Sequence, residues 1–292
     1  MSTDRDRIIV ITGSTGGIGY QSALGLAKTG ARIIITGRNQ ERGEAARRRI
    51  VEESGNDAVE LVIGDVSSIA GVDALARELL KRVDHIDVLV NNAGYLGSEP
   101  KRSADGIEMH FAVNVLAPRR LAQALLPALQ AADHARVLNV TGGDKPAAVD
   151  IDNLQAEKGF KGLMTYAHSK SAMEAMSMVL SREFEPEGVS VNVVFPGRAS
   201  TAMTGSMTSK SLPGAMKLLL PLFRLMFKED GGKSAAKAAK STIWGATTPQ
   251  LDGVTGRYFD THTKEQKLHP TAYEAAVQDR IVAIADSVAP SP

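Results

Sequence analysis

Short apolar runs and longer amphipathic stretches alternate along most of the chain, from Arg7 to Phe195. The short runs are rich in β-branched residues, which is typical of strands buried on both faces of a sheet. They predict strands at residues 8–12, 31–36, 58–63, 87–90, 136–141 and 189–195, with a last strand near 256–260. The stretches between them have helical periodicity and predict helices at 20–28, 39–53, 67–82, about 103–131, about 164–184 and 271–288.

This alternation is typical of βαβ units, in which parallel strands form one sheet with helices on both faces. The chain has no linker-like stretch and no internal repeat. We therefore predict a single α/β domain over residues 1–292, with a doubly wound parallel sheet of about seven strands. An insertion is expected at about 202–232, and a C-terminal helix at about 271–288.

The first predicted strand runs directly into a glycine-rich turn that contains Gly13, Gly17 and Gly19. A helix starts there, and its unpaired backbone N–H groups and positive dipole end attract phosphate. Glycine allows a tight turn and a close approach of the backbone to a pyrophosphate. The turn, including Ser14, Thr15 and Ile18, is therefore a candidate dinucleotide site, although glycine-rich turns also occur in proteins without a ligand.

Other notable residues also follow predicted strands. In an open α/β sheet, ligands bind outside the carboxyl ends of the strands. The residues at such ends are Gly37-Arg38, Asp65-Val66, Asn91-Asn92-Ala93-Gly94, Thr141-Gly142 and Pro196-Gly197. Their common location predicts that they surround one ligand.

The residues after the second strand indicate which dinucleotide the candidate site would bind. An acidic residue there holds a ribose 2′-hydroxyl, whereas an arginine accommodates a 2′-phosphate. The chain has Arg38 at this point and no acid before Glu41, so we predict NADP(H) rather than NAD(H). A solvated surface arginine is the alternative. Asp65 is a candidate partner of the adenine amino group or an acid at a helix N-terminus, and the two roles are compatible.

Tyr166 and Lys170 are four residues apart on a predicted helix, so their side chains leave from one face. A free tyrosine titrates near ~10, and a nearby ammonium favours the phenolate and lowers this pKa. Such a pair suits proton exchange with an alcohol or carbonyl oxygen. A tyrosine and a lysine at this spacing are frequent by chance. The pair is a more specific sign of a catalytic site here because it follows the glycine turn and the Asn91–Gly94 segment.

These motifs together resemble the short-chain dehydrogenase/reductase family from Arg7 to about Asp260. The resemblance implies a Rossmann-type fold with Tyr166 as general acid–base and Lys170 as the group that lowers its pKa and holds the nicotinamide ribose. It further implies roles for Asn114 in a water-linked proton relay, for Thr201 and Pro196-Gly197 at the nicotinamide amide, and for Asn91, Ala93 and Gly94 beside the cofactor. The resemblance also implies a homodimer or homotetramer, the assemblies that are common in this family.

Three stretches are most similar to the retinol-dehydrogenase-like branch of that family: TYAHSK, the DNLQAEKGF stretch before it, and GRYFD near the end. The resemblance implies a lipophilic alcohol, aldehyde or ketone as substrate, often with NADP(H). In the family, the region after Pro196-Gly197 closes over the substrate. The very apolar residues 212–227 are therefore expected to form a lid, with peripheral membrane contact or a subunit contact as alternatives.

One departure from the family concerns the serine that holds the substrate oxygen. Alignment from Arg136 places Gly142 at the position of this serine, and residues 104–168 contain no serine. Thr141 has a hydroxyl but points to the other face of an ideal strand. Because the following glycines permit unusual dihedral angles, we predict that Thr141 turns inward, with a water molecule or a weakened enzyme as the alternatives.

Composition narrows the possible functions. The net charge of +1 is scattered along the chain, which argues against nucleic acid as a partner. The chain has no cysteine, its six histidines lack metal-ligand spacing, and we predict no metal. We see no signal-peptide pattern and no apolar run of ~20 residues, so we expect a cytoplasmic protein. The two hypotheses are an NADP(H)-dependent oxidoreductase and an NADP(H)-binding sensor or scaffold with lost catalysis.

Overall fold

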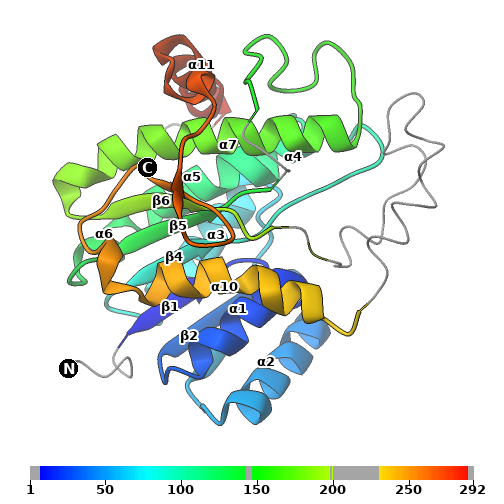
Figure 1. Cartoon of the computed structure of the whole chain (residues 1–292). Coiled ribbons are helices and arrows are strands. Elements are labelled where there is room, and N and C mark those ends of the chain that lie inside the picture. Colours follow the sequence, from blue (N-terminus) through cyan, green and yellow to red (C-terminus); the bar gives the residue numbers. More distant parts are fainter. Residues whose placement is uncertain (1–6, 143–146, 198, 200–229, 289–292) are drawn as a thin grey trace.

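The computed structural model describes residues 7–142, 147–197, 199 and 230–288. Thr201 and most of the predicted lid insertion at about 202–232, including the apolar stretch 212–227, lie outside these residues, so the predictions for them remain predictions. In the described part, a central sheet lies between two layers of helices (Figure 1).

Within the described residues, the sheet has eight strands in the order β3-β2-β1-β4-β5-β6-β7-β8, and every pairing is parallel except that of β7 with β8. The strands are β1 (Ile8–Ile11), β2 (Arg32–Gly37), β3 (Val59–Ile63), β4 (Val88–Asn91), β5 (Arg136–Val140), β6 (Ser190–Val194), β7 (Tyr258–Phe259) and β8 (Glu265–Gln266). The strand order reverses between β1 and β4, which is where a doubly wound sheet binds its ligand. The predicted parallel α/β domain is confirmed.

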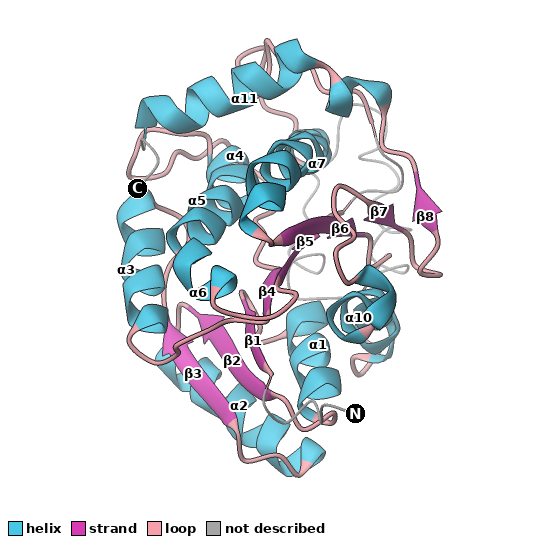
Figure 2. Cartoon of the chain, turned by 90° about the vertical axis from the view of Figure 1, so that its left-hand side faces the viewer, coloured by secondary structure: helices cyan, strands magenta, loops and turns pink. Residues whose placement is uncertain are grey.

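Helices cover both faces of this sheet (Figures 1 and 2). One layer contains α1 (Gly17–Ala27), α2 (Gln40–Ser54) and α10 (Lys233–Thr247). The other contains α3 (Ile69–Leu80), α4 (Met109–Phe111), a π-helical turn (Ala112–Leu116), α5 (Ala117–Ala124), α6 (Leu126–Gln130) and α7 (Leu163–Phe184). The C-terminal helix α11 (Ala275–Val288) packs on α7 from outside.

Two apolar cores follow from the strand sequences, one on each face of the sheet. Alternate residues of β1 separate into these cores: Val10 faces α3, α5 and α7, whereas Ile9 and Ile11 face α1 and α2. All three side chains are at most 1% exposed. Burial on both faces explains why the strands are nearly continuous apolar runs.

The predicted helix at 103–131 is wrong in its first part and is interrupted in its second. Residues 103–107 form a tight turn in which Gly106 has φ +78°, a conformation that favours glycine. Pro118 and Pro127 lie in the first turns of α5 and α6, where the missing N–H costs no helical hydrogen bond. These prolines therefore begin new helices and divide the predicted one.

Three further elements differ from the prediction. The helix α10 was missed because its buried face consists of small residues such as Ala235, Ala238 and Ala239, which give a weak apolar pattern. The two-residue strand β8 is exposed and polar, and it makes the strand count eight rather than seven. The predicted helix at 271–288 begins as a 3₁₀ turn (Pro270–Tyr273) before α11.

Candidate active site

The glycine turn after β1 forms a tight cradle. Gly13 and Gly17 have φ angles of +63° and +56°, which favour glycine. A Cβ on Gly19 would lie 2.6 Å from the Gly13 carbonyl oxygen and 2.4 Å from Asn92 Nδ2. Gly16 caps the N-terminus of α1 without a side-chain hydrogen bond. The first N–H groups of this helix are thus left for a ligand, and the cradle fits a pyrophosphate.

Side chains on two neighbouring strand ends hold the cradle in place. Asn92 Nδ2 donates to the carbonyl oxygens of Thr12 (2.9 Å) and Gly13 (3.1 Å). The Thr12 hydroxyl in turn accepts from the backbone N–H groups of Asn92 and Ala93. The Asn91–Gly94 segment and the glycine turn therefore form one unit at the point where the strand order reverses.

Two predicted cofactor residues have internal partners instead. The buried Ser14 hydroxyl donates to the Ile11 carbonyl oxygen at 2.7 Å and accepts from the Thr36 N–H at 3.0 Å. The Asn91 side chain donates to Asn139 Oδ1 at 2.9 Å. Both side chains brace the sheet, so a contact of Ser14 or Asn91 with a cofactor would have to come from the backbone.

Arg38 is exposed at the end of β2, beside the cradle. The methyl group of Thr15 packs on Gly37, where it leaves no room for a Cβ. Burial and Glu108 raise the pKa of Tyr95, and the charge of Arg38 opposes this rise, so Arg38 lies within electrostatic range of the segment after β4. The structure thus brings Arg38 to the glycine turn from the adjacent strand.

The other predicted contacts lie around the same edge of the sheet. Asp65 is exposed, and its Oδ1 accepts from the Ser67 N–H at 2.9 Å, as expected of an acid before a helix. Val66 packs against the core and Ile18 against a small cluster with Ala199. Pro196 and Gly197 are the second and third residues after the end of β6, and Gly197 has φ +84°.

Tyr166 lies in the first turn of α7, with its hydroxyl at Gly142, the second residue after the end of β5. A Cβ on Gly142 would lie 2.4 Å from Tyr166 Oη, so the two residues are in direct contact. Gly142 is therefore the residue beside the hydroxyl, as the alignment predicted. Burial raises the pKa of Tyr166 to about 12, which favours the neutral phenol.

Lys170 is buried one helical turn further along α7. Its Nζ donates to the Val140 carbonyl oxygen at 3.0 Å. Burial lowers the pKa of Lys170 to about 8, and the charge of Glu174 opposes this effect. Burial alone raises the Tyr166 pKa here, and Lys170 is hydrogen-bonded to β5, so the lowering of the Tyr166 pKa by Lys170 stays a prediction.

The prediction for Thr141 needs correction. The Thr141 hydroxyl donates to Glu174 Oε1 at 2.6 Å, and the residue is 4% exposed. The side chain thus keeps the orientation of a regular strand and is engaged by α7, whereas Gly142 lies against Tyr166. Thr141 does not turn inward to replace the missing serine.

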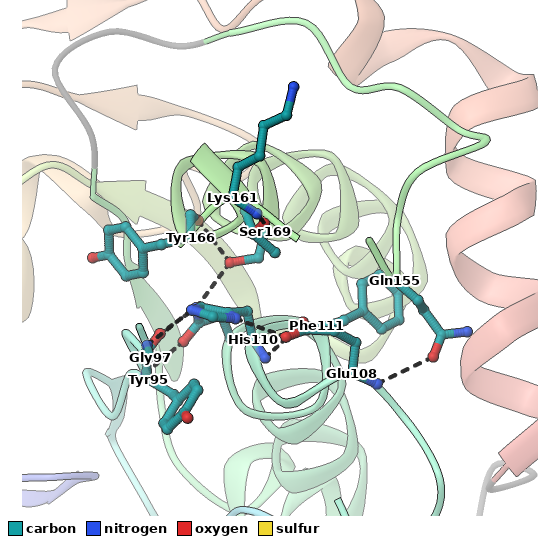
Figure 3. A network of polar contacts seen from close by, with 11 residues as sticks. Tyr95, Gly97, Glu108, His110, Phe111, Gln155, Lys161, Tyr166 and Ser169 are labelled. Atoms are coloured by element: carbon teal, nitrogen blue, oxygen red, sulfur yellow. Dashed lines mark hydrogen bonds and ion pairs between the residues drawn. The ribbon is translucent and has the colours of Figure 1, made fainter. Parts of the chain in front are cut away.

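Asn114 lies in the π-helical turn Ala112–Leu116, a local distortion that often marks a functional site. Its amide accepts from the Tyr95 N–H at 2.8 Å and donates to Ser169 Oγ at 2.8 Å. The Ser169 hydroxyl donates to the Tyr166 carbonyl oxygen at 2.7 Å (Figure 3). Asn114 therefore links the segment after β4 to the first turn of α7.

A buried His110 supports this link from below (Figure 3). Its Nε2 accepts from the Gly97 N–H at 3.0 Å, so the ring proton is on Nδ1, which contacts Glu108 Oε1 at 2.8 Å. The ring lies edge-on to those of Tyr95 and Tyr166, with centroids 4.9 and 6.5 Å away. His110 thereby positions the segment that faces Tyr166.

Sequence reasoning missed Ser169, His110 and Glu174. The signal for Glu174 was a charge in the otherwise apolar part of α7, four residues after Lys170. His168, which lies between Tyr166 and Lys170 in the sequence, is half-buried, and its Nε2 accepts from the Asp150 N–H at 2.9 Å. In the described part of the chain, no group of three or more acidic or histidine side chains could hold a metal ion.

The comparisons with known proteins agree with this geometry. A family model described as short chain dehydrogenase matches residues 7–212. Retinol dehydrogenase 13 from Mus musculus is 32% identical over 280 residues, which cover 94% of this chain and 81% of the relative. Polyprenol dehydrogenase from Homo sapiens is 31% identical over 284 residues, with 94% and 83% covered.

Solved structures share this fold. A crystal structure from Mycobacterium paratuberculosis superposes with a TM-score of 0.74 at 22% identity, covering 98% of this chain and 94% of the other, which bears on the fold alone. A short chain dehydrogenase from Shigella flexneri complexed with NADP has a TM-score of 0.66 at 27% identity, with 89% and 100% covered. None of the helices described here is both long and apolar enough to cross a membrane.

Proposed function

The chain belongs to the short-chain dehydrogenase family, in its retinol-dehydrogenase-like branch, and on this premise we propose that it is an NADP(H)-dependent oxidoreductase that interconverts a lipophilic alcohol and its aldehyde or ketone. Oxidoreduction of CH–OH and C=O groups is common to these relatives. The lipophilic substrate is proposed from the names of the relatives, which include retinol and polyprenol dehydrogenases.

One observation carries the proposal. The Tyr166 hydroxyl, the buried Lys170 and the glycine cradle all lie at the carboxyl ends of neighbouring parallel strands. When bound, a nicotinamide supplies or accepts the hydride. Tyr166, held as a neutral phenol by burial, is suited to donate a proton to the oxygen of a carbonyl substrate.

The preference for NADP(H) is supported by Arg38 and by NADP and NADPH in complexes of similar proteins. We expect Arg38→Ala to raise the Kd of NADPH about 10- to 100-fold, because charge-assisted hydrogen bonds contribute about 1.5–3 kcal/mol. The Kd of NADH should stay within about twofold. Titration of intrinsic fluorescence with each cofactor measures both. The control is Arg77→Ala, which removes an exposed arginine on α3. If Arg38→Ala weakens the binding of NADPH and NADH equally, the preference for NADP(H) is contradicted.

Gly142 favours a second candidate function, an NADP(H)-binding sensor or scaffold with lost catalysis, because it brings no hydroxyl to Tyr166. If the site is catalytic, Gly142→Ala should lower kcat about 10- to 100-fold, since a Cβ displaces the Tyr166 hydroxyl and misplacement by ~1 Å is costly. The Kd of NADPH should hardly change. A wild type that binds NADPH but turns over no substrate would instead favour the second candidate.

A further inference from the structure

Glu174 is a buried carboxyl group that the proposed reaction does not use. It lies on α7 one helical turn after Lys170, and both residues are at most 4% exposed. Oε1 of Glu174 accepts the hydrogen bond from Thr141 Oγ1 at 2.6 Å. A carboxyl group in such a place is uncommon, because burial of a charge is unfavourable without a compensating partner.

The two α7 side chains hold consecutive residues at the end of β5. Lys170 Nζ donates to the carbonyl oxygen of Val140, and Glu174 accepts from the side chain of Thr141. Gly142, which contacts the Tyr166 hydroxyl, comes next in the chain. The strand end that faces Tyr166 is therefore fixed to α7 by one cationic and one acidic side chain.

The charges of this pair stabilise each other. Burial lowers the pKa of Lys170 to about 8, and the Glu174 carboxylate acts to raise it. Burial raises the pKa of Glu174 to about 7, while the Thr141 hydrogen bond and Lys170 act to lower it. On β7, burial and then the charges of Glu174 and Asp260 raise the pKa of Tyr258. Its phenol stays neutral and leaves the ammonium–carboxylate pair as the charged groups.

We propose that Glu174 is a positioning residue: it supplies the buried counter-charge to Lys170 one helical turn away, and the two side chains together hold the end of β5 against Tyr166. This inference rests on the proposed function and takes Lys170 to act in it as an ammonium. The highest pH at which the enzyme remains active then depends on the carboxyl group of Glu174, which does not touch the substrate. Above that limit, Lys170 loses its proton and with it the charge that the site requires.

The first test measures Lys170 directly and needs no turnover. The signal of its ¹³C-labelled ε-carbon, assigned by its absence in Lys170→Arg, is followed by NMR as pH rises. We expect Glu174→Gln, which keeps the shape and the Thr141 hydrogen bond, to lower the midpoint by about one pH unit. Glu183→Gln, on the exposed end of the same helix, is the matched control and should leave the midpoint unchanged.

An unchanged midpoint in a folded Glu174→Gln variant would overturn the inference, since a carboxyl group that only fills space alters thermal stability alone. Thr141→Val provides an independent variant. It removes the hydrogen bond that favours the Glu174 carboxylate, so the Lys170 midpoint should fall in the same direction, and a rise would also overturn the inference.

The second test follows the pH dependence of kcat. The alkaline limb of Glu174→Gln should move to lower pH by the same interval as the NMR midpoint, and a limb that stays in place would contradict the role in the reaction. If the wild type turns over no substrate, the proposed function fails, and the NMR titration still decides whether Glu174 sets the charge of Lys170.

Discussion

Replacement of Tyr166 by phenylalanine is expected to lower kcat about 10²- to 10⁴-fold, the usual contribution of a positioned acid–base group. The physical reason is the place of the hydroxyl: it contacts Gly142 at the end of β5, where the proposed function requires the substrate oxygen. The phenylalanine ring keeps the packing against His110. Folding and the Kd of NADPH should therefore be retained, which thermal unfolding and fluorescence titration measure.

A matched control is Tyr20→Phe. Tyr20 lies on α1, where its hydroxyl donates to Glu53 on α2, far from the end of β5. This variant loses one hydrogen bond and should keep its kcat within about twofold while losing about 1 kcal/mol of stability. If Tyr166→Phe retains wild-type kcat on a substrate that the wild type turns over, Tyr166 is not the acid–base group.

Gly19→Ala should raise the Kd of NADPH about 10- to 100-fold. The added Cβ would lie 2.6 Å from the carbonyl oxygen of Gly13 and 2.9 Å from the Cα of Ser14, and both are backbone atoms of the turn. The turn must then open, and the loss of one or two charge-assisted hydrogen bonds to a pyrophosphate accounts for an effect of this size. Isothermal titration calorimetry gives the affinity.

Gly16→Ala is the natural comparison, because a Cβ on Gly16 would have no heavy atom within 4 Å. Its φ of −176° is extended backbone that any residue adopts. We expect this variant to bind NADPH within about threefold of wild type, apart from a small loss at the helix cap. Equal affinities of Gly19→Ala and Gly16→Ala would show that the tight turn is not the cofactor site.

The parallel sheet and the cofactor turn could be predicted from sequence because both depend on local patterns. Runs such as 8–12 are buried on both faces and stay apolar throughout, so the strand signal is strong. The turn needs glycine where φ is positive, as at Gly13, and this requirement is visible in the sequence. The helix α10 lacks such a signal, since its alanines are buried only because α1 lies opposite.

The residues of the candidate site also fall into those that a local sequence pattern predicts and those that it does not. Tyr166 and Lys170 are recognisable from their spacing on one helix, and Gly142 from the alignment after β5. The orientation of Thr141 was predicted wrongly because its partner, Glu174, is 33 residues away in sequence. The same holds for His110, whose bond to Gly97 and contact with Tyr166 depend on the packing of α4 against α7. Contacts of this kind come from tertiary structure and leave no local pattern.

The most direct test of the central claim is transfer of a labelled hydride. The protein is incubated with NADPH carrying deuterium at nicotinamide C4 and with a panel of long-chain aliphatic and aromatic aldehydes and ketones, and the products are examined by mass spectrometry. We predict that, for at least one carbonyl compound, one alcohol forms per NADPH consumed, with deuterium on its carbinol carbon. Saturable NADPH binding without any alcohol product across the panel, and without NADP⁺ reduction by the corresponding alcohols, would contradict the account.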